Sequence, residues 1–255
     1  MQIFSFNYNE SLFLENQIES FRKFISDEIV FNCVDNSTKP SVKEDIKRIC
    51  EKNNVRYFDV KNPSNDVGSQ SHSRALNFTI QHLLNPNDKC FLVDGDVYAI
   101  KPINLDETIG DAHFAGVYQK RHIHEYLHPG FMFINTPKVP NIKELNMTPG
   151  PVAGVNCDTG GQLSLFYKKY NYVVKYLSFN NLYNNLINYP ETHITKPEIH
   201  REDLKSIYNK DYGIEIIENK LIHFRGGSRW NNDILYDKKV EFFNEYLRRS
   251  KNEPL

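Results

Sequence analysis

The chain has 255 residues, of which 40% are hydrophobic and 25% charged, enough for one large or two small globular domains. Its net charge is −1, from 31 basic and 32 acidic side chains, which argues against bulk electrostatic binding to nucleic acid or to an acidic membrane. The 4 cysteines are scattered without a Cys-x-x-Cys pair, which argues against a zinc site or a disulfide framework.

Short apolar runs alternate with stretches of helical periodicity over the first hundred residues. The predicted elements are a strand at 3–6, a helix at 12–24, a strand at 29–34, a helix at 41–51, a strand at 55–60, a helix at 71–84 and a strand at 91–93. Ser41 and Glu44 form a plausible capping box for the second helix. This alternation predicts an α/β fold with a mainly parallel, doubly wound sheet that binds ligands at the carboxyl ends of its strands.

The rest of the chain is expected to extend this sheet and to end in a small hairpin and a helix. The expected elements are strands at 112–117 and 130–134, a loop at 141–156, a helix at 162–177, a hairpin at 214–217 and 220–224, and a helix at 233–249. The Asn-rich stretch 180–212 has no clear pattern. Because no linker divides the chain, we expect one domain over residues 1–255.

The strongest functional signal is Asp94-Gly95-Asp96, which follows the apolar strand at 91–93. Side chains repeat every second residue along a strand, so both carboxylates leave on the same side, about 6.6 Å apart. At an effective dielectric near 20 they repel each other by roughly 2–3 kcal/mol, which a bound cation would relieve. Mg²⁺ or Mn²⁺ holding a diphosphate suits these ligands, and Gly95 would let a ligand approach the backbone. The competing interpretation is a turn that one aspartate caps.

Several motifs, taken in order, resemble the GT-A glycosyltransferases, which use nucleotide-diphospho-sugars. The motifs are Arg74 in a helix, Asp94-Gly95-Asp96, Pro129-Gly130-Phe131-Met132-Phe133-Ile134-Asn135 and His223-Phe224-Arg225-Gly226-Gly227-Ser228-Arg229-Trp230. The last motif is most similar to that of glycosyltransferase family 8, the glycogenin and galactosyltransferase type. It departs from that family by lacking a proline before Trp230 and by having Arg229 in place of lysine. The stretch 71–77 also resembles family 2-like and viral enzymes.

The resemblance implies a metal-dependent transfer of a sugar from a nucleotide-diphospho-sugar, with UDP-sugar favoured, to a glycan or another hydroxyl acceptor. It implies a nucleotide-binding half at 1–110, an acceptor half with the metal-binding histidine at 111–232, and a C-terminal helix at 233–255. No stretch is long and apolar enough to be a transmembrane segment, so we expect a cytoplasmic protein, in the host cytoplasm if the source is viral.

His223 is the expected third ligand of a Mn²⁺ or Mg²⁺ ion held by Asp94 and Asp96, because a neutral imidazole binds such metals well. The adjoining Gly226 and Gly227 would let backbone amides approach a phosphate, and Arg229 would clamp it. The competing interpretation of His223 is a structural histidine in an apolar strand.

Three more side chains receive candidate roles in this scheme. Asp35, just past the second strand, would meet the base or ribose, or form a simple turn. Arg74 would assist at the phosphates, or be a solvated helix residue. Asp158 would be the general base of an inverting enzyme or a positioning group in a retaining one. A structural alternative is that Thr159 and Gln162 form a capping box and that Asp158 only favours the helix dipole.

Two regions have weaker signals. His122, His124 and His128 share one predicted loop and would form a second metal site, shape an acceptor pocket or simply be solvated. The basic and aromatic C-terminal helix would associate weakly with a membrane surface or be an ordinary surface helix.

Three rival functions fit parts of the pattern. A phosphohydrolase of the haloacid dehalogenase type also has a strand followed by Asp-x-Asp, but near its N-terminus and with Thr or Val where this chain has Tyr98. A nucleotidyltransferase that makes nucleotide sugars opens with a glycine-rich loop containing lysine, which residues 7–10 lack. A degenerate glycan-binding module would bind glycans without Mn²⁺-dependent nucleotide binding.

Overall fold

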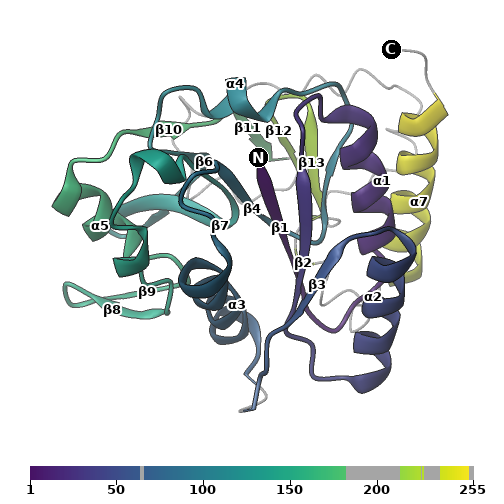
Figure 1. Ribbon diagram of the computed structural model, residues 1–255, viewed down its shortest axis with the longest axis horizontal. Helices are drawn as coiled ribbons and strands as arrows, with labels where there is room; N and C mark the ends of the chain where they lie inside the picture. The colour runs from purple at the N-terminus through teal and green to yellow at the C-terminus, as the bar shows by residue number, and fades with distance from the viewer. Residues whose placement is uncertain (64–65, 182–212, 225, 227–235, 253–255) are drawn as a thin grey trace.

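The computed structural model describes residues 1–63, 66–181, 213–224, 226 and 236–252. Within this part of the chain, seven strands form a central sheet in the order β10-β6-β7-β4-β1-β2-β3 (Figure 1). Its strands are β1 (Gln2–Asn7), β2 (Val30–Asp35), β3 (Arg56–Asp59), β4 (Cys90–Asp94), β6 (Phe114–Arg121), β7 (His124–Ile134) and β10 (Val174–Tyr176). The helices are α1 (Leu14–Phe24), α2 (Pro40–Lys52), α3 (Gly68–Phe78), α4 (Leu105–Ile109), α5 (Leu163–Tyr170) and α7 (Tyr236–Asn252).

Four neighbouring strands, β3, β2, β1 and β4, run parallel. β7 runs antiparallel to both β4 and β6, and β10 runs parallel to β6. The prediction of an α/β fold with a mainly parallel sheet flanked by helices is confirmed. The carboxyl ends of β1, β2 and β4 therefore lie at one edge of the sheet, where a ligand site is expected.

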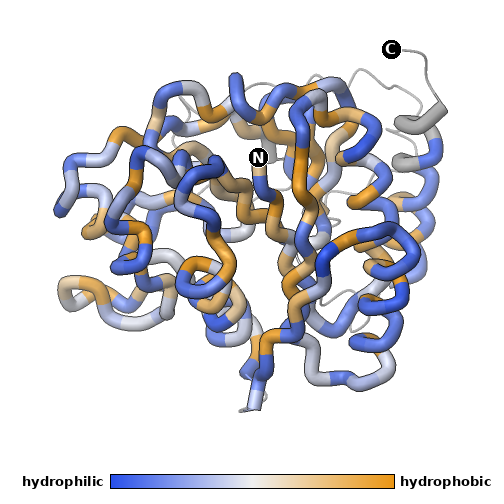
Figure 2. Tube along the Cα trace, in the orientation of Figure 1, coloured by the Kyte–Doolittle hydropathy of each residue, from blue (hydrophilic) through white to orange (hydrophobic). Residues whose placement is uncertain are grey.

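Helices cover both faces of this sheet, which explains the unbroken apolar run before Asp94. Phe91 and Val93 pack with α1 and α2 on one face, whereas Leu92 packs with α3 and α5 on the other. All three side chains are fully buried. Figure 2 shows hydrophobic residues along the central strands and many hydrophilic residues along the helices around them. A strand buried on both faces cannot alternate apolar and polar residues, so its sequence is continuously apolar.

A second sheet joins the turn after β4 to the end of the chain. Its order is β11-β12-β13-β5, with β5 (Val97–Ala99), β11 (Phe179–Asn181), β12 (Ile214–Ile217) and β13 (Leu221–Phe224). The predicted hairpin at 214–224 is confirmed as β12 and β13, and its turn residues Glu218 and Asn219 both have positive φ. β13 pairs antiparallel with β5, which places His223 opposite Val97.

Helix α7 covers the outer face of this second sheet. Phe243 is fully buried, with its ring 4.9 Å from that of Phe224, 5.2 Å from Tyr98 and 5.0 Å from Phe13. The aromatic side of α7 is thus used for packing; the basic residues Arg249 and Lys251 lie outside the side chains described. None of the helices in the described part of the chain combines the length and the hydropathy that crossing a bilayer requires.

Two predicted capping boxes are wrong. Helix α2 begins at Pro40 rather than at Ser41, and Lys39 is its N-cap, with no side-chain cap. A proline is well suited to the first helical position, because its missing N–H would have no partner there. Helix α5 begins at Leu163 after Gln162, and the N-cap again makes no side-chain hydrogen bond.

A helix end and a loop are among the predicted boundaries that differ from the structure. The helix expected at 162–177 ends at Tyr170, because Asn171 takes a left-handed backbone conformation with φ 54°; strand β10 follows. Asparagine tolerates this conformation better than most residues. The loop expected at 141–156 contains a hairpin of β8 (Gly150–Val152) and β9 (Val155–Cys157).

We predict that Phe243→Ala lowers the free energy of unfolding by about 3–5 kcal/mol, because it removes a fully buried ring from the aromatic cluster under α7. Urea denaturation measures this change. Glu241→Ala, at an exposed position of the same helix, is the matched control and should change stability by less than about 0.5 kcal/mol. A loss below about 1 kcal/mol for Phe243→Ala would contradict the packing described here.

Candidate metal centre

The backbone holds the Asp94-Gly95-Asp96 turn from two sides. Asp94 is the last residue of β4, and Asp96 directly precedes β5. The Gly95 N–H donates to the Phe6 carbonyl at 3.0 Å, and the Phe224 N–H donates to the Asp96 carbonyl at 2.9 Å. The turn is therefore fixed to β1 on one side and to β13 on the other, which sets where both carboxylates point.

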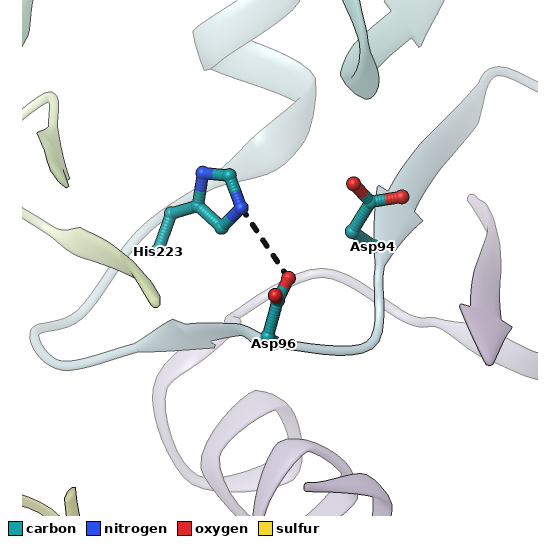
Figure 3. Close-up of side chains that lie close together, drawn as sticks. All are labelled: Asp94, Asp96 and His223. Atoms are coloured by element: carbon teal, nitrogen blue, oxygen red, sulfur yellow. Dashed lines mark ion pairs between the residues drawn. The ribbon is translucent and has the colours of Figure 1, made fainter. Parts of the chain in front are cut away.

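His223 completes a cluster with these two carboxylates (Figure 3). Its Nε2 lies 3.3 Å from Asp96 Oδ1, and one ligand atom from each of Asp94, Asp96 and His223 lies within 4.8 Å of the others. Among the described residues, this is the one group of at least three His, Cys, Asp or Glu side chains placed to hold a metal ion. The structure thus brings together the three side chains that the sequence selects.

The donor set fits a hard divalent cation. Donor atoms at about 2.1 Å from an ion are at most about 4.2 Å apart, so small side-chain adjustments suffice for all three to bind one ion. Two carboxylates and one imidazole suit Mn²⁺ and also accommodate Mg²⁺. The Asp94 side chain is 26% exposed, Asp96 10% and His223 3%, so Asp94 is the most accessible of the three ligands.

Glu215 is a partner of His223 that the sequence analysis missed. It lies on β12 directly opposite His223, and its Oε2 is 2.7 Å from Nδ1. Both side chains are almost fully buried. Nδ1–H donates to Glu215, so Nε2 faces Asp96 and would bind a metal in place of its proton; a carboxylate placed in this way orients the ring of a metal-binding histidine. The sequence signal was a single charged residue in the apolar strand Ile214-Glu215-Ile216-Ile217.

The carboxylates around His223 favour its protonated ring when no metal is bound. Burial lowers the pKa of His223, but the neighbouring Asp96 and Glu215 carboxylates outweigh burial and raise it to about 10. A bound cation would take the place of this proton on Nε2, because imidazole binds metals in its neutral form.

His72, on α3, is a second histidine of the centre. Its Nε2 lies 3.1 Å from Asp94 Oδ1. Burial raises the pKa of Asp94, but His72, His128 and His223 lower it more, so it lies well below its usual range and Asp94 is ionised. Conversely, burial lowers the pKa of His72, whereas Asp94 and two other aspartates raise it above its usual value. The contact between His72 and Asp94 thus favours a protonated imidazole together with an ionised carboxylate.

Two glycines next to the centre have different roles. A Cβ at Gly130, on β7, would lie 2.0 Å from Asp94 Oδ2 and 2.4 Å from its Cγ, so the Asp94 carboxylate occupies the space that a side chain would need. A Cβ at Gly95 would lie 2.6 Å from Asn7 Oδ1 and 3.1 Å from the Phe6 carbonyl oxygen. The space that a side chain at Gly95 would need is thus filled by β1, while Gly95 itself lines the cavity next to the cluster, as a ligand approaching its backbone requires.

The metal cluster opens into a cavity of about 820 Å³ at the carboxyl edge of the parallel strands. This is within the usual size of small-molecule sites, about 300–1,000 Å³. Residues from the ends of β1 and β2 and from α3 line it together with the cluster. The lining includes Asn7, Asn36, His72, Asp94, Asp96, His128, Asp158, His223 and Gly226.

Asp158, the candidate for the reaction centre, lines this cavity. Its Oδ1 accepts hydrogen bonds from the Ser69 hydroxyl and from the Thr159 N–H, the latter at 2.8 Å, and Arg121 lies 3.7 Å from its Oδ2. Burial raises the pKa of Asp158, but these three neighbours lower it below its usual value. Asp158 is therefore an ionised and firmly held carboxylate.

Asp35 and Arg74 are held by other contacts. Asp35 is fully buried and accepts hydrogen bonds from the Ser37 N–H at 2.8 Å and the Tyr57 hydroxyl at 2.9 Å. Arg74 forms an ion pair with Asp66. Neither Asp35 nor Arg74 is among the residues that line the cavity. Their contacts with base, ribose and phosphate stay predictions.

The glycine-rich segment after His223 is described only in part. Gly226 lines the cavity, has φ 77°, and would place a Cβ in open space. Gly227 and Arg229 lie outside the described residues.

The three histidines expected in one loop, at positions 122, 124 and 128, lie apart from one another, because most of that segment belongs to β7. His122 is at an exposed turn with φ 53°. His124 is buried and bonded to the Val152 carbonyl at 2.9 Å and the Ser164 hydroxyl at 3.2 Å. His128 accepts a hydrogen bond from the Gly130 N–H at 3.2 Å, and its ring centroid is 5.9 Å from that of His223. They form no second metal cluster in the described structure.

We predict that Glu215→Leu weakens Mn²⁺ binding about 10–100-fold, because His223 loses the acceptor that orients its ring. Glu215→Gln should lose less, since the amide oxygen can still accept from Nδ1–H. Titration with Mn²⁺ alone, followed by electron paramagnetic resonance of the free ion, measures both, with circular dichroism as the check on folding. Glu144→Gln, an exposed glutamate paired with Lys169, is the control. Wild-type Mn²⁺ affinity in folded Glu215→Leu would refute the orienting role.

No family model matches the chain, and no curated protein matches it. Several solved structures are similar to it. A mannosyltransferase from Pyrobaculum calidifontis, in complex with GDP-Man and Mn²⁺, is similar with a TM-score of 0.50 and 10% identity, over 69% of this chain and 53% of that chain. The match thus spans about half of the mannosyltransferase.

Two further structures are similar over more of their length. The galactosyltransferase LgtC, in complex with donor and acceptor sugar analogues, aligns over 100% of this chain and 98% of that chain, with a TM-score of 0.49 and 11% identity. The glycosyltransferase GlyE of Streptococcus pneumoniae TIGR4 aligns over 97% of this chain and 62% of that chain, with a TM-score of 0.47 and 12% identity. At these low identities a likeness concerns the fold, and the similarity to the mannosyltransferase shows that this chain has the GT-A fold.

Proposed function

We propose that this chain is a Mn²⁺- or Mg²⁺-dependent glycosyltransferase that moves a sugar from a nucleotide-diphospho-sugar, with UDP-sugar favoured, to a hydroxyl acceptor such as a glycan. The observation that carries the proposal is the convergence of Asp94, Asp96 and His223 in a cavity at the carboxyl edge of the parallel strands. Two carboxylates and an imidazole around an open approach suit an ion that also binds diphosphate oxygens.

The metal's part is electrostatic: when bound, the ion neutralises negative charge on the departing nucleoside diphosphate. The protein's part is to hold Asp94, Asp96 and His223 in place through the backbone contacts of the turn and through Glu215. His72 lies in the same cavity, and the protonated form that its aspartate neighbours favour would place further positive charge beside Asp94. Positive charge that is fixed before the reaction lowers the barrier without reorganisation.

The contacts of Asp158 favour one of its two candidate roles. A general base works best when its pKa is near the working pH, whereas the pKa of Asp158 is lowered and its Oδ1 already accepts two hydrogen bonds. These contacts suit a fixed negative charge that positions the reacting groups. We therefore assign Asp158 the positioning role of a retaining enzyme rather than the general base of an inverting one.

The test is Mn²⁺-dependent hydrolysis or transfer of UDP-sugars. We predict that Asp96→Asn and His223→Ala each lower kcat/KM at least about 100-fold, equivalent to about 3 kcal/mol of lost charge stabilisation. Asp106→Asn, an exposed aspartate paired with Lys89, is the matched control and should retain activity.

Full activity of both variants at low Mn²⁺ would show that the cluster is not the metal site. Release of phosphate from simple phosphate esters, without sugar transfer, would favour a phosphohydrolase instead.

A further inference from the structure

A second, smaller cavity of about 350 Å³ adjoins the one that holds the metal centre. Val67, Ser69 and Asp158 line both cavities, whereas Asp94, Asp96 and His223 line only the larger one. Asp158 thus stands where the two cavities meet. A transfer reaction needs two substrates whose reacting atoms come together at one point, and the junction at Asp158 provides such a point.

The walls of the smaller cavity come from two segments that are far apart in the sequence. One is the start of α3 with the residue before it, contributing Val67, Ser69 and Gln70. The other is the β8–β9 hairpin with the residue before it, contributing Pro149, Gly150, Asn156 and Cys157. The Ser69 hydroxyl donates to Asp158, and the Thr159 hydroxyl donates to the Ser69 carbonyl at 2.9 Å, so the two walls are tied together beside the junction.

The chemistry of this lining is mostly neutral. Among the described residues that line the smaller cavity, Asp158 is the one charged side chain. Gln70 and Asn156 offer amide donors and acceptors, while Val67, 69% exposed, and Pro149 offer apolar surface. A sugar ring presents hydroxyls at its edge and C–H groups on its faces, which matches amides beside apolar surface. A phosphate or carboxylate would instead meet the ionised Asp158.

We propose that the smaller cavity is the acceptor site and that it binds an uncharged sugar, one of whose hydroxyls reaches past Asp158 into the larger cavity. This inference rests on the proposed sugar-transfer function. In the transfer, a bond forms between the acceptor oxygen and the anomeric carbon, and the bond from that carbon to the diphosphate oxygen breaks. The bonding electron pair leaves with the diphosphate, which also takes the acceptor's proton.

The experiment uses the full chain with Mn²⁺ and the UDP-sugar that it hydrolyses, and it measures UDP release. The acceptor probes are methyl glycosides of neutral hexoses, the corresponding hexose 6-phosphates, and a peptide containing Ser and Thr. We expect at least one neutral methyl glycoside to raise UDP release above the rate in water, and the hexose 6-phosphates and the peptide to have no such effect.

Variants of the hairpin locate the site. Asn156→Ala should raise KM for the neutral glycoside about tenfold, more than it changes KM for the donor, because it removes one hydrogen-bonding group from the smaller cavity alone. Ala153→Asn is the matched control: it lies at the hairpin tip outside both cavities, where φ 47° suits asparagine, and it should leave both KM values unchanged.

The outcomes separate this inference from the function on which it rests. If no nucleotide sugar is hydrolysed with Mn²⁺, the proposed function fails and the inference fails with it. If hydrolysis occurs but no neutral glycoside accelerates it, or if the phosphates or the peptide are better acceptors, the inference alone is wrong. Equal changes in both KM values for Asn156→Ala would also overturn it.

Discussion

The pairing of β13 with β5 is the contact on which the candidate site depends. β5 follows directly after Asp96, and β13 comes from a hairpin more than a hundred residues later in the chain. The hydrogen bond from the Phe224 N–H to the Asp96 carbonyl, at 2.9 Å, joins the two at the metal cluster. Tyr98 of β5 and Phe224 of β13 pack against each other and against α7, which keeps the two strands together. This buried aromatic cluster therefore sets the position of His223, the third metal ligand.

The strand pairing brings carboxylates and imidazoles together at a site with little exposure to solvent. Asp94, Asp96 and Glu215 bring three carboxylates, and His72 and His223 bring two imidazoles whose pKa values are raised by them. Buried charges are costly unless each has a partner, so the histidines and carboxylates stabilise one another when no cation is present. A divalent cation bound at Asp94, Asp96 and His223 would take the place of the proton on His223. Pairing between the protein's own groups therefore keeps the ligands in place for the metal.

Sequence patterns that depend on neighbouring residues predicted most of the fold and the centre of the site. The apolar run at Phe91 and the spacing of Asp94 and Asp96 are local, and they led to the strand and the carboxylates. The sequence analysis missed Glu215 because its contact with His223 depends on the register of β12 against β13. It missed His72 because the contact of His72 with Asp94 depends on how α3 faces the sheet. Asp35 ends a strand as a binding residue would, but the hydroxyl of Tyr57 on β3 occupies its carboxylate. Asn171 ends α5 through its left-handed backbone conformation, which the spacing of apolar residues does not predict.

The central claim is that the Asp94, Asp96 and His223 cluster holds a cation so that the cavity can bind a nucleotide-sugar diphosphate. Thermal unfolding with a panel of nucleotide sugars, each with and without Mn²⁺, tests it most directly. A donor present at about 100 times its dissociation constant should stabilise the protein by roughly 2.7 kcal/mol, and only when Mn²⁺ is present. Stabilisation of equal size without Mn²⁺, or none from any nucleotide sugar with it, would contradict this account.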